Sequence, residues 1–433
     1  MVSVLLMGVT GPAGWDAQNC WKAVQSVRQG GDPYAEGIAA QQAFHNRPAS
    51  SAGASAPLTY VYSPLTLSLL RLLALLPDWL LRLLFWSAIA GGFFLQLWAG
   101  FQLANAGERR WLALLLPAVA FFPGLITDDV ILSGNVAYII YGPILAAAVY
   151  GWKRNRWLWY YVAVLAASIC KAPFLTMLAF PVLVGKRQWL SAAGTAAAGL
   201  LVIAAQARLW PMLFSEYLTV LRLMFEEAHD FGYGPAGVVG KALWKLGLPY
   251  SSATTIVYLG CAAVVGLGLL FVSRRVGRDS LAPEISLRSS EGSLRENWIP
   301  VALVGTFLLN PRIMKYDMAA LTVPMLLIGW RLLRNALERA PQKRTLILAV
   351  AASCFIFPNL ITVAGPAWWP VELAMMVGIL GMGIVFLNRT SLVFRWTYVA
   401  PGTALPGHGQ PTLLPARVTY DEVVPIPVVE PII

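Results

Sequence analysis

Long apolar runs separated by short polar segments dominate this chain, and they constrain its fold more than any other feature. A globular protein of 433 residues cannot bury this much apolar side chain, because 58% of the residues are hydrophobic and only 12% are charged. A helix needs roughly 20 mostly apolar residues to cross about 30 Å of hydrocarbon, and the runs suffice for about 12 such crossings. The sequence therefore predicts an all-α, polytopic helical membrane protein.

The distribution of positive charge predicts which loops face the cytoplasm. Complete spans are expected at about residues 79–104, 111–127, 131–150, 157–170, 172–184, 189–210, 251–273, 298–310, 318–333, 345–363 and 368–387. Alternate connections hold 17 Lys and Arg between them, at 106–110, 151–156, 185–188, 274–296 and 331–344. The short loops facing them hold 3. The positive-inside rule places the first set, and both termini, in the cytoplasm.

The polar segments divide the chain into regions. In order, we expect a partial first span at 1–13, a long outer loop with an interfacial helix at 14–78, a transmembrane core at 79–210, an outer loop at 211–250, a span at 251–273, a cytoplasmic loop at 274–297, C-terminal transmembrane helices at 298–390 and a disordered, Pro-rich cytoplasmic tail at 391–433. Residues 1–10 would reach only about 15 Å as a helix, so the first span is short or truncated. Residues 64–76 are also too short to cross, and Arg71 suits a helix on the membrane surface.

Composition also excludes several classes of site. The net charge of +11 comes from short basic clusters between apolar runs, which is a topogenic pattern, so no nucleic acid partner is expected. The four cysteines show no C-x-x-C spacing and no metal-ligand pattern. We predict neither a disulfide framework nor a metal site.

Unusual polar residues gather at the predicted outer ends of the helices. They are Asp16, Tyr34 in the D-P-Y turn, Asp128, Asp129, Asn135, Lys171, His229, Arg312, Lys315, Tyr316 and Asp317. Charge kept near hydrocarbon is costly and usually marks function. Carboxylates together with Lys and Arg suit the transfer of a group from an anionic lipid carrier.

Several motifs occur in an order that resembles glycosyltransferase family 87. These are D-x-x-x-x-W-x-A-V-x-x-V-x-x-G-G-D-P-Y, Y-V-Y-S-P-L-x-L-S-L-L-R-L-L-A-L-L-P, S-G-N, C-K-A-P-F-L-x-x-L and N-P-R-I-M-K-Y-D. The resemblance covers residues 14 to about 385. The resemblance implies a C-type glycosyltransferase fold in the cell (inner) membrane. It also implies inverting transfer of a hexose, typically mannose, from a polyprenyl phosphate carrier to a lipid or glycan acceptor on the extracytoplasmic side, with no cofactor.

The resemblance assigns roles to individual residues. Asp16 matches the catalytic aspartate of the first loop, so residues 14–78 are expected to be the catalytic loop. An inverting displacement needs one general base and a cation beside the leaving phosphate. Arg312, Lys171 and Lys315 are the candidates for that cation. Asn135 stands where many members of the family have Gln. Some members carry a histidine in a late outer loop, and the corresponding residues 310–317, here called the late loop, offer Lys315, Tyr316 and Asp317 instead.

Each candidate also has a purely structural interpretation. Asp16 precedes a helix and could be its N-cap. Lys171 could extend its side chain from a helix end to the membrane interface, and Arg312 could pair with Asp317. Asp128 and Asp129 could begin the next helix, and His229 could be an interfacial loop residue.

Two other functions fit a chain of this composition. A secondary transporter or lipid flippase is the first alternative, although transporters tend to be built from related halves with charged segments at the bilayer midplane. The long first outer loop, which makes the chain asymmetric, and the polar groups at one surface favour the enzyme over the transporter. A catalytically silent membrane assembly partner is the second alternative.

Overall fold

The computed structural model describes residues 14–45, 59–121, 133–185, 187–226, 232, 234–249, 251–279, 294–364, 374 and 377–388. Every regular element in these residues is a helix, as the sequence predicts. In chain order they are α2 (Trp15–Arg28), α3 (Pro33–His45), α4 (Pro64–Leu73), α5 (Asp78–Leu103), α6 (Ala106–Phe121), α8 (Ala137–Arg154), α9 (Leu158–Cys170), η2 (Ala172–Leu178), α10 (Ala179–Val184), α11 (Trp189–Leu209), α12 (Pro211–Glu226), α13 (Pro235–Lys245), α14 (Ser251–Asp279), α15 (Leu294–Phe307), η4 (Lys315–Leu321), α16 (Thr322–Arg339), η5 (Pro341–Lys343) and α17 (Arg344–Ala364). An apolar helix also covers Val377–Asn388.

Four helices in the described part are long and apolar enough to cross a membrane: Asp78–Leu103, Trp189–Leu209, Ser252–Val276 and Tyr316–Arg339. Only 11% of the apolar window of Ser252–Val276 is buried, whereas 67% of that of Tyr316–Arg339 is buried. The last helix is therefore central and the other three are peripheral. These helices are those of a helical membrane protein, and the count of about 12 spans stays a prediction.

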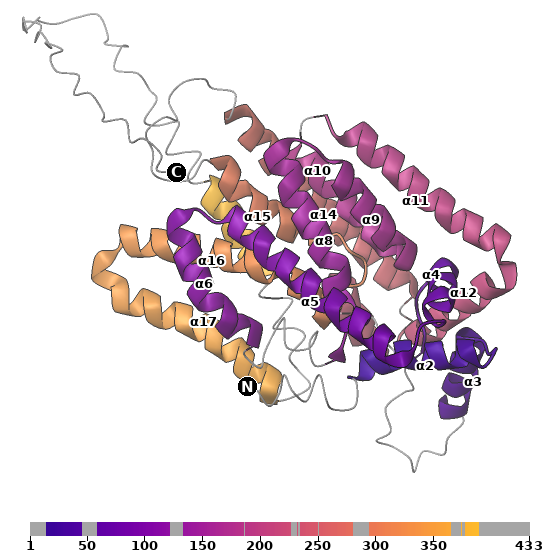
Figure 1. Ribbon diagram of the computed structural model, residues 1–433. Coiled ribbons are helices and arrows are strands. Elements are labelled where there is room, and N and C mark those ends of the chain that lie inside the picture. The colour runs from indigo at the N-terminus through magenta and orange to yellow at the C-terminus, as the bar shows by residue number, and fades with distance from the viewer. Residues whose placement is uncertain are drawn as a thin grey trace, which may run out of the picture. The chain divides into compact units, whose positions relative to one another are not determined.

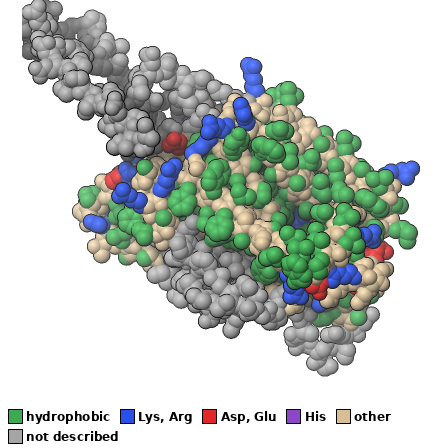
Figure 2. Space-filling model, in the orientation of Figure 1, with side chains coloured by type: hydrophobic (Ala, Val, Ile, Leu, Met, Phe, Trp, Pro, Cys, Tyr) green, Lys and Arg blue, Asp and Glu red, His purple; other side chains and the backbone are tan. Residues whose placement is uncertain are grey.

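The exposed surface is as apolar as the sequence implies. Figure 2 shows hydrophobic side chains over much of the described surface in view, with Lys and Arg mostly near its margins. Large exposed side chains include Phe94 of α5, Leu201 of α11 and Val264 of α14, with exposed fractions of 66%, 69% and 73%. A patch of this kind is unfavourable in water and favourable against lipid.

Local sequence signals explain where the first helices begin and end. Gly14 is the N-cap of α2, and Gly30 after its end has φ +75°, a conformation that glycine adopts without strain. Ser63 caps α4 by accepting from the N–H of Thr66, and Pro64 occupies the first helical position. The break at Pro77 then separates α4 from α5.

Small residues let α5 pack closely against its neighbours. A Cβ at Gly92 would lie 2.0 Å from the carbonyl oxygen of Tyr138, and a Cβ at Gly142 would lie 2.2 Å from the carbonyl oxygen of Gly92. The backbones of α5 and α8 therefore touch, as at the small-residue crossings of membrane helices. On the same face of α5, Gln96 is buried and donates to the carbonyl oxygen of Ala319 in η4.

Four helices gather at one end of the bundle. Helices α2, α3, α4 and α12 contact one another there, near the start of α5 and the end of α11 (Figure 1). Tyr34, Tyr60, Leu67 and Val220 form a small core between them. We call this end the α2 end.

Two predicted segments differ in extent from the structure. Helix α14 continues to Asp279, beyond the start of the loop predicted at 274–297, because no proline occurs before Pro283 and the basic residues from Arg274 suit a helix C-terminus. The predicted outer loop at 211–250 contains the helices α12 and α13. The predicted partial span at 1–13 and tail at 391–433 lie outside the described residues.

Candidate functional site at the α2 end

Asp16 lies in the first turn of α2, where its side chain accepts a hydrogen bond from Asn135. The N-cap of this helix is Gly14, so the interpretation of Asp16 as an N-cap is wrong. The Nδ2 of Asn135 donates to the Oδ2 of Asp16. The Oδ1 of Asn135 accepts from the backbone N–H of Ala137 at 2.9 Å, which fixes the orientation of the amide. The carboxylate is thus held by a buried and oriented donor.

Gly134 allows Asn135 to come this close to α2. Its φ is +64°, and a Cβ at this position would lie 2.7 Å from the Cβ of Ala17. A larger residue would both strain the backbone and push α2 away. The S-G-N motif therefore positions the partner of Asp16 through its glycine.

Cys20 lies one helical turn after Asp16, and the charges of Asp16 and Lys171 both act on its thiol. Burial raises the pKa of the Cys20 thiol to about 12, the charge of Asp16 raises it as well, and the charge of Lys171 lowers it. Both charges can act on one thiol only if both are near it. The structure thus brings together the predicted base and one predicted phosphate ligand.

Lys171 stands in extended backbone between α9 and η2, with φ −147° and ψ 114°. Its Nζ lies 5.2 Å from the centre of the Tyr62 ring and 5.7 Å from the centre of the Tyr316 ring. Within the described part of the chain, Lys171 makes no ion pair with a carboxylate. Its ammonium is therefore held by aromatic faces.

Asp317 is the second carboxylate of the site and is buried. Its Oδ2 accepts from the N–H of Met314 at 2.9 Å, and its Oδ1 accepts from the hydroxyl of Tyr141 at 3.3 Å. The charges of both Lys171 and Arg312 act on it. The late loop therefore carries a carboxylate on which the charge of Lys171 acts.

Arg312 lies on that same loop. Its backbone N–H donates to the Oδ1 of Asn310 at 3.1 Å. Gly232 packs against it so closely that a Cβ there would lie 2.9 Å from the Cγ of Arg312. The segment before α13 thus borders the loop that carries the second predicted phosphate ligand.

Tyr34, a predicted substrate-binding residue, lies in the protein core. It is fully buried in the small core of the α2 end, and its hydroxyl donates to the carbonyl oxygen of Tyr62 at 2.5 Å. Its ring centre lies 5.5 Å from that of Tyr60 and 6.1 Å from that of Tyr217. Tyr34 therefore fixes the segment that carries Tyr62 rather than facing a ligand.

Four predicted site residues cannot be placed by their side chains. Asp128, Asp129 and His229 lie outside the described residues, and only the backbone of Lys315 is described, at the start of η4. The other predicted residues of the late loop, Tyr316 and Asp317, face Lys171 as given above.

Three site residues were not predicted as candidates. Tyr62 contacts Lys171, Cys20 lies beside Asp16, and Tyr141 binds Asp317. The spacing of four between Asp16 and Cys20 places them on one helix face and could have identified the cysteine. Tyr62 and Tyr141 reach the site through contacts distant in sequence. Tyr62 belongs to the Y-V-Y-S-P motif, but no local signal assigned it a role, and Tyr141 lies within an apolar run.

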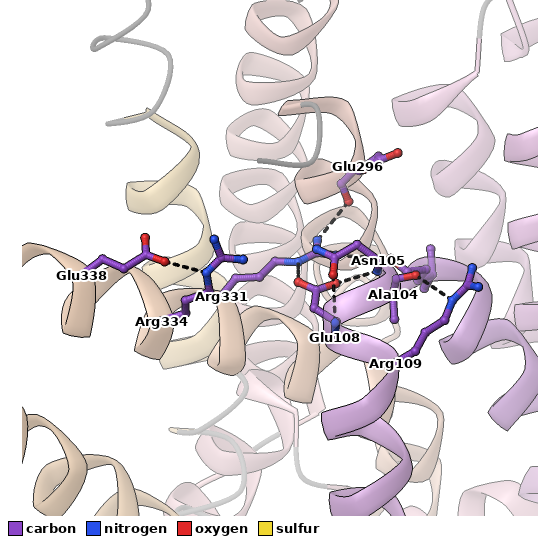
Figure 3. Close-up of polar contacts among 9 residues, drawn as sticks. Ala104, Asn105, Glu108, Arg109, Glu296, Arg331, Arg334 and Glu338 are labelled. Carbon is purple, nitrogen blue, oxygen red and sulfur yellow. Dashed lines mark hydrogen bonds and ion pairs between the residues drawn. The ribbon is translucent and has the colours of Figure 1, made fainter. Parts of the chain in front are cut away.

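A second polar cluster lies away from the α2 end and serves as a reference. Arg331 of α16 reaches Glu108 at the start of α6 (Figure 3), with its Nε 2.7 Å from Oε1 and its Nη2 2.9 Å from Oε2. Arg331 also donates to the carbonyl oxygens of Glu296 and Leu103, both at 3.2 Å. Asn105 and Glu108 form a reciprocal cap of α6. This cluster joins helices, and its arginine makes four hydrogen bonds to them.

Comparison with known proteins identifies no relative. No family model, no curated protein sequence and no solved structure matches this chain. The family resemblance seen in the motifs therefore stays a prediction.

Proposed function

We propose that this protein is a membrane glycosyltransferase that moves a hexose from a polyprenyl phosphate carrier to a lipid or glycan acceptor. The observation that carries the proposal is the position of Asp16. Its carboxylate is held by the buried amide of Asn135 and shares the neighbourhood of Cys20 with Lys171. A proton acceptor next to a cation is the minimal equipment of this reaction.

In the proposed reaction, the acceptor hydroxyl oxygen bonds to the anomeric carbon while the bond from that carbon to the phosphate oxygen breaks. The hydroxyl proton passes to the carboxylate of Asp16 and the bonding electrons leave with the phosphate. Because the leaving phosphate gains negative charge, a cation beside it lowers the barrier. Lys171 and Arg312, which both act on Asp317, are the described residues suited to this role.

The more specific parts of the proposal rest on the motifs that resemble glycosyltransferase family 87. They are a C-type architecture of about 12 spans, an inner cell membrane location, an extracytoplasmic active site and mannose as the hexose. The apolar helices of the described part are compatible with a lipid-borne donor. A donor that stays in the bilayer must meet its enzyme there.

The test is the Asp16→Asn variant, assayed in membranes with a radiolabelled polyprenyl-phosphate sugar. Loss of the general base should lower the transfer rate by about 10²–10⁴-fold while the protein remains folded. The matched control is Asp78→Asn, which removes an exposed carboxylate paired with Arg28 and should leave transfer near the wild-type rate.

Normal transfer by Asp16→Asn would refute Asp16 as the base. Absence of transfer by the wild-type protein from any polyprenyl-phosphate hexose would refute the enzyme itself. Uptake or flipping of a substrate by such a preparation would instead support the transporter alternative.

A further inference from the structure

We propose that Tyr62 and Tyr316 form an aromatic clamp that presents the ammonium of Lys171 to a phosphate group. The inference deepens the proposed function and rests on it, because the phosphate is that of the donor. It makes both tyrosines positioning residues that act through Lys171.

The clamp is made by two segments that are distant in sequence. The Tyr62 ring comes from the extended segment before α4 and the Tyr316 ring from η4, and their centres lie 5.2 Å and 5.7 Å from the Nζ of Lys171. Both distances are within the range of a cation–π interaction. Lys171 is thus in contact with two rings at once.

The Tyr62 ring is fixed relative to the backbone of Lys171. The N–H of Ser63 donates to the carbonyl oxygen of Cys170 at 3.4 Å, and the carbonyl oxygen of Tyr62 accepts from Tyr34. Ser63 is therefore bound to the residue that directly precedes Lys171, and the backbone of Tyr62 is held by Tyr34. Burial also raises the pKa of the Tyr62 hydroxyl, with smaller contributions from Cys20 and Asp16, so the ring stays neutral at pH 7.

The Tyr316 ring is fixed through its neighbour. Asp317 accepts from the N–H of Met314 and from Tyr141 of α8, and Gln96 of α5 donates to the carbonyl oxygen of Ala319. These bonds hold η4 against two helices of the core. The backbone that carries the Tyr316 ring is therefore held in place.

An aromatic face holds a cation without occupying its hydrogen-bond donors. A carboxylate partner would neutralise the ammonium and take up its N–H groups, as Glu108 does with Arg331. Ring faces instead leave the three N–H donors of Lys171 available. An ammonium is a compact point charge, and a phosphate offers it several oxygen acceptors. A phosphate group is therefore the class of ligand that this arrangement fits.

The experiment measures binding of farnesyl phosphate to the full-length protein in detergent, by equilibrium dialysis. Tyr62→Leu should weaken binding by about 2- to 30-fold, whereas Tyr62→Phe keeps the ring and should bind like wild type. In the Lys171→Met background, Tyr62→Leu should cause no further loss, since the ring acts only through the ammonium. Tyr258→Leu, which alters a tyrosine of α14 that donates to the carbonyl oxygen of Leu309, is the control and should not change binding.

A series of fluorinated phenylalanines at position 62 keeps the test decisive if Tyr62→Leu does not fold. Fluorine withdraws charge from the ring face at nearly constant volume, so binding should weaken stepwise with each added fluorine. A flat series, or an equal loss from Tyr62→Leu with and without Lys171, would overturn the clamp.

A second readout separates this inference from the proposed function. Lysines are dimethylated with ¹³C-formaldehyde, and the signal of Lys171 is identified by its loss in Lys171→Arg. Ring currents should shift this signal upfield in wild type and in Tyr62→Phe, and less so in Tyr62→Leu. Failure of sugar transfer with these shifts present contradicts the enzyme alone, whereas an unshifted signal contradicts the clamp alone.

Discussion

Lys171 and Arg331 are cations set in opposite environments of one protein. Arg331 makes two hydrogen bonds to the carboxylate of Glu108 and two more to backbone carbonyl oxygens. Lys171 lies over two tyrosine rings and makes no ion pair within the described part of the chain. Asp317, next to Tyr316, lies in η4, which directly precedes α16, the helix that carries Arg331.

The difference teaches how to separate structural from functional charge in an apolar protein. A buried ion pair that uses most of its hydrogen-bond donors within the protein, as Arg331 does, joins helices and has little left to offer a ligand. A cation held by ring faces is stabilised less but retains its hydrogen-bond donors. Charge type alone does not distinguish the two, whereas the contacts of each cation do.

The largest expected effect is on stability, at Arg331. Arg331→Met would leave Glu108, whose side chain is 4% exposed, without its partner. Breaking a buried pair in this way should lower the free energy of unfolding by about 3–5 kcal/mol. Denaturant unfolding in detergent micelles measures the change.

The double variant Glu108→Leu with Arg331→Met serves as the control for that prediction. Because it removes both charges, it should recover most of the lost stability. A single variant as stable as wild type would show that the pair does not hold α6 and α16 together.

The next effect is on activity, at Lys171. Lys171→Met should lower the rate of sugar transfer by about 10²–10³-fold, the usual cost of one donor to a developing oxyanion. Its free energy of unfolding should stay within about 1 kcal/mol of wild type, because it breaks two ring-face contacts and no ion pair of the described residues, while Arg312 still acts on the charge of Asp317. Transfer and unfolding are measured on the same preparation.

Lys153→Met is the matched control for the activity prediction. Lys153 is exposed and donates to Gln102 at 2.9 Å, so its loss should change neither quantity. A large loss of stability in Lys171→Met with normal transfer per folded molecule would reverse the assignment of the two cations.

Sequence patterns predict where the helices lie in the chain better than they predict which helices pack together. Apolar length predicted the helical class, and the glycines after α2 and the break at Pro77 predicted helix ends, because these signals act within a few residues. The contact of Gly92 with Tyr138 joins helices about 45 residues apart in the chain, and no local rule selects that pairing.

The same limit applies to the site. Asp16, Lys171 and Asp317 were predicted as candidates one by one, because charge next to an apolar run is unusual. Their shared neighbours, Cys20 and Tyr62, were not, since a thiol or a ring near an apolar run is ordinary. Arg331 was predicted only as one of many cytoplasmic charges, and its buried pairing depends on the docking of α6.

A smaller effect concerns pH, where two carboxyl groups should respond with opposite sign. Burial raises the pKa of Glu108, but the hydrogen bonds and charge of Arg331 outweigh it and hold the pKa below its ordinary value of 4.5. The stability that Glu108 contributes is therefore present above the ordinary pKa and is lost as pH falls through the folded pKa. For Glu216, burial and then the hydrogen bond and charge of Asp32 raise the pKa, so its contribution is lost as pH rises.

Unfolding of wild type, Glu108→Gln and Glu216→Gln between about pH 3 and 7 tests both signs. The advantage of wild type over Glu108→Gln should shrink toward low pH, and its advantage over Glu216→Gln should shrink toward high pH. Asp32→Asn should weaken the second trend without abolishing it, because burial, the largest cause, remains. Two trends of the same sign would contradict the assigned causes.

The smallest effect is expected at the exposed pair of Arg334 and Glu338, one turn beyond Arg331 on the same helix. Their N–O distance is 2.7 Å, equal to that of the Arg331 pair, but their side chains are 48% and 51% exposed. Water and salt screen exposed pairs, so Glu338→Gln should change the free energy of unfolding by less than about 0.5 kcal/mol. A change as large as that of Arg331→Met would mean that distance rather than burial decides the strength of these pairs, and the contrast between the two cations would lose its physical basis.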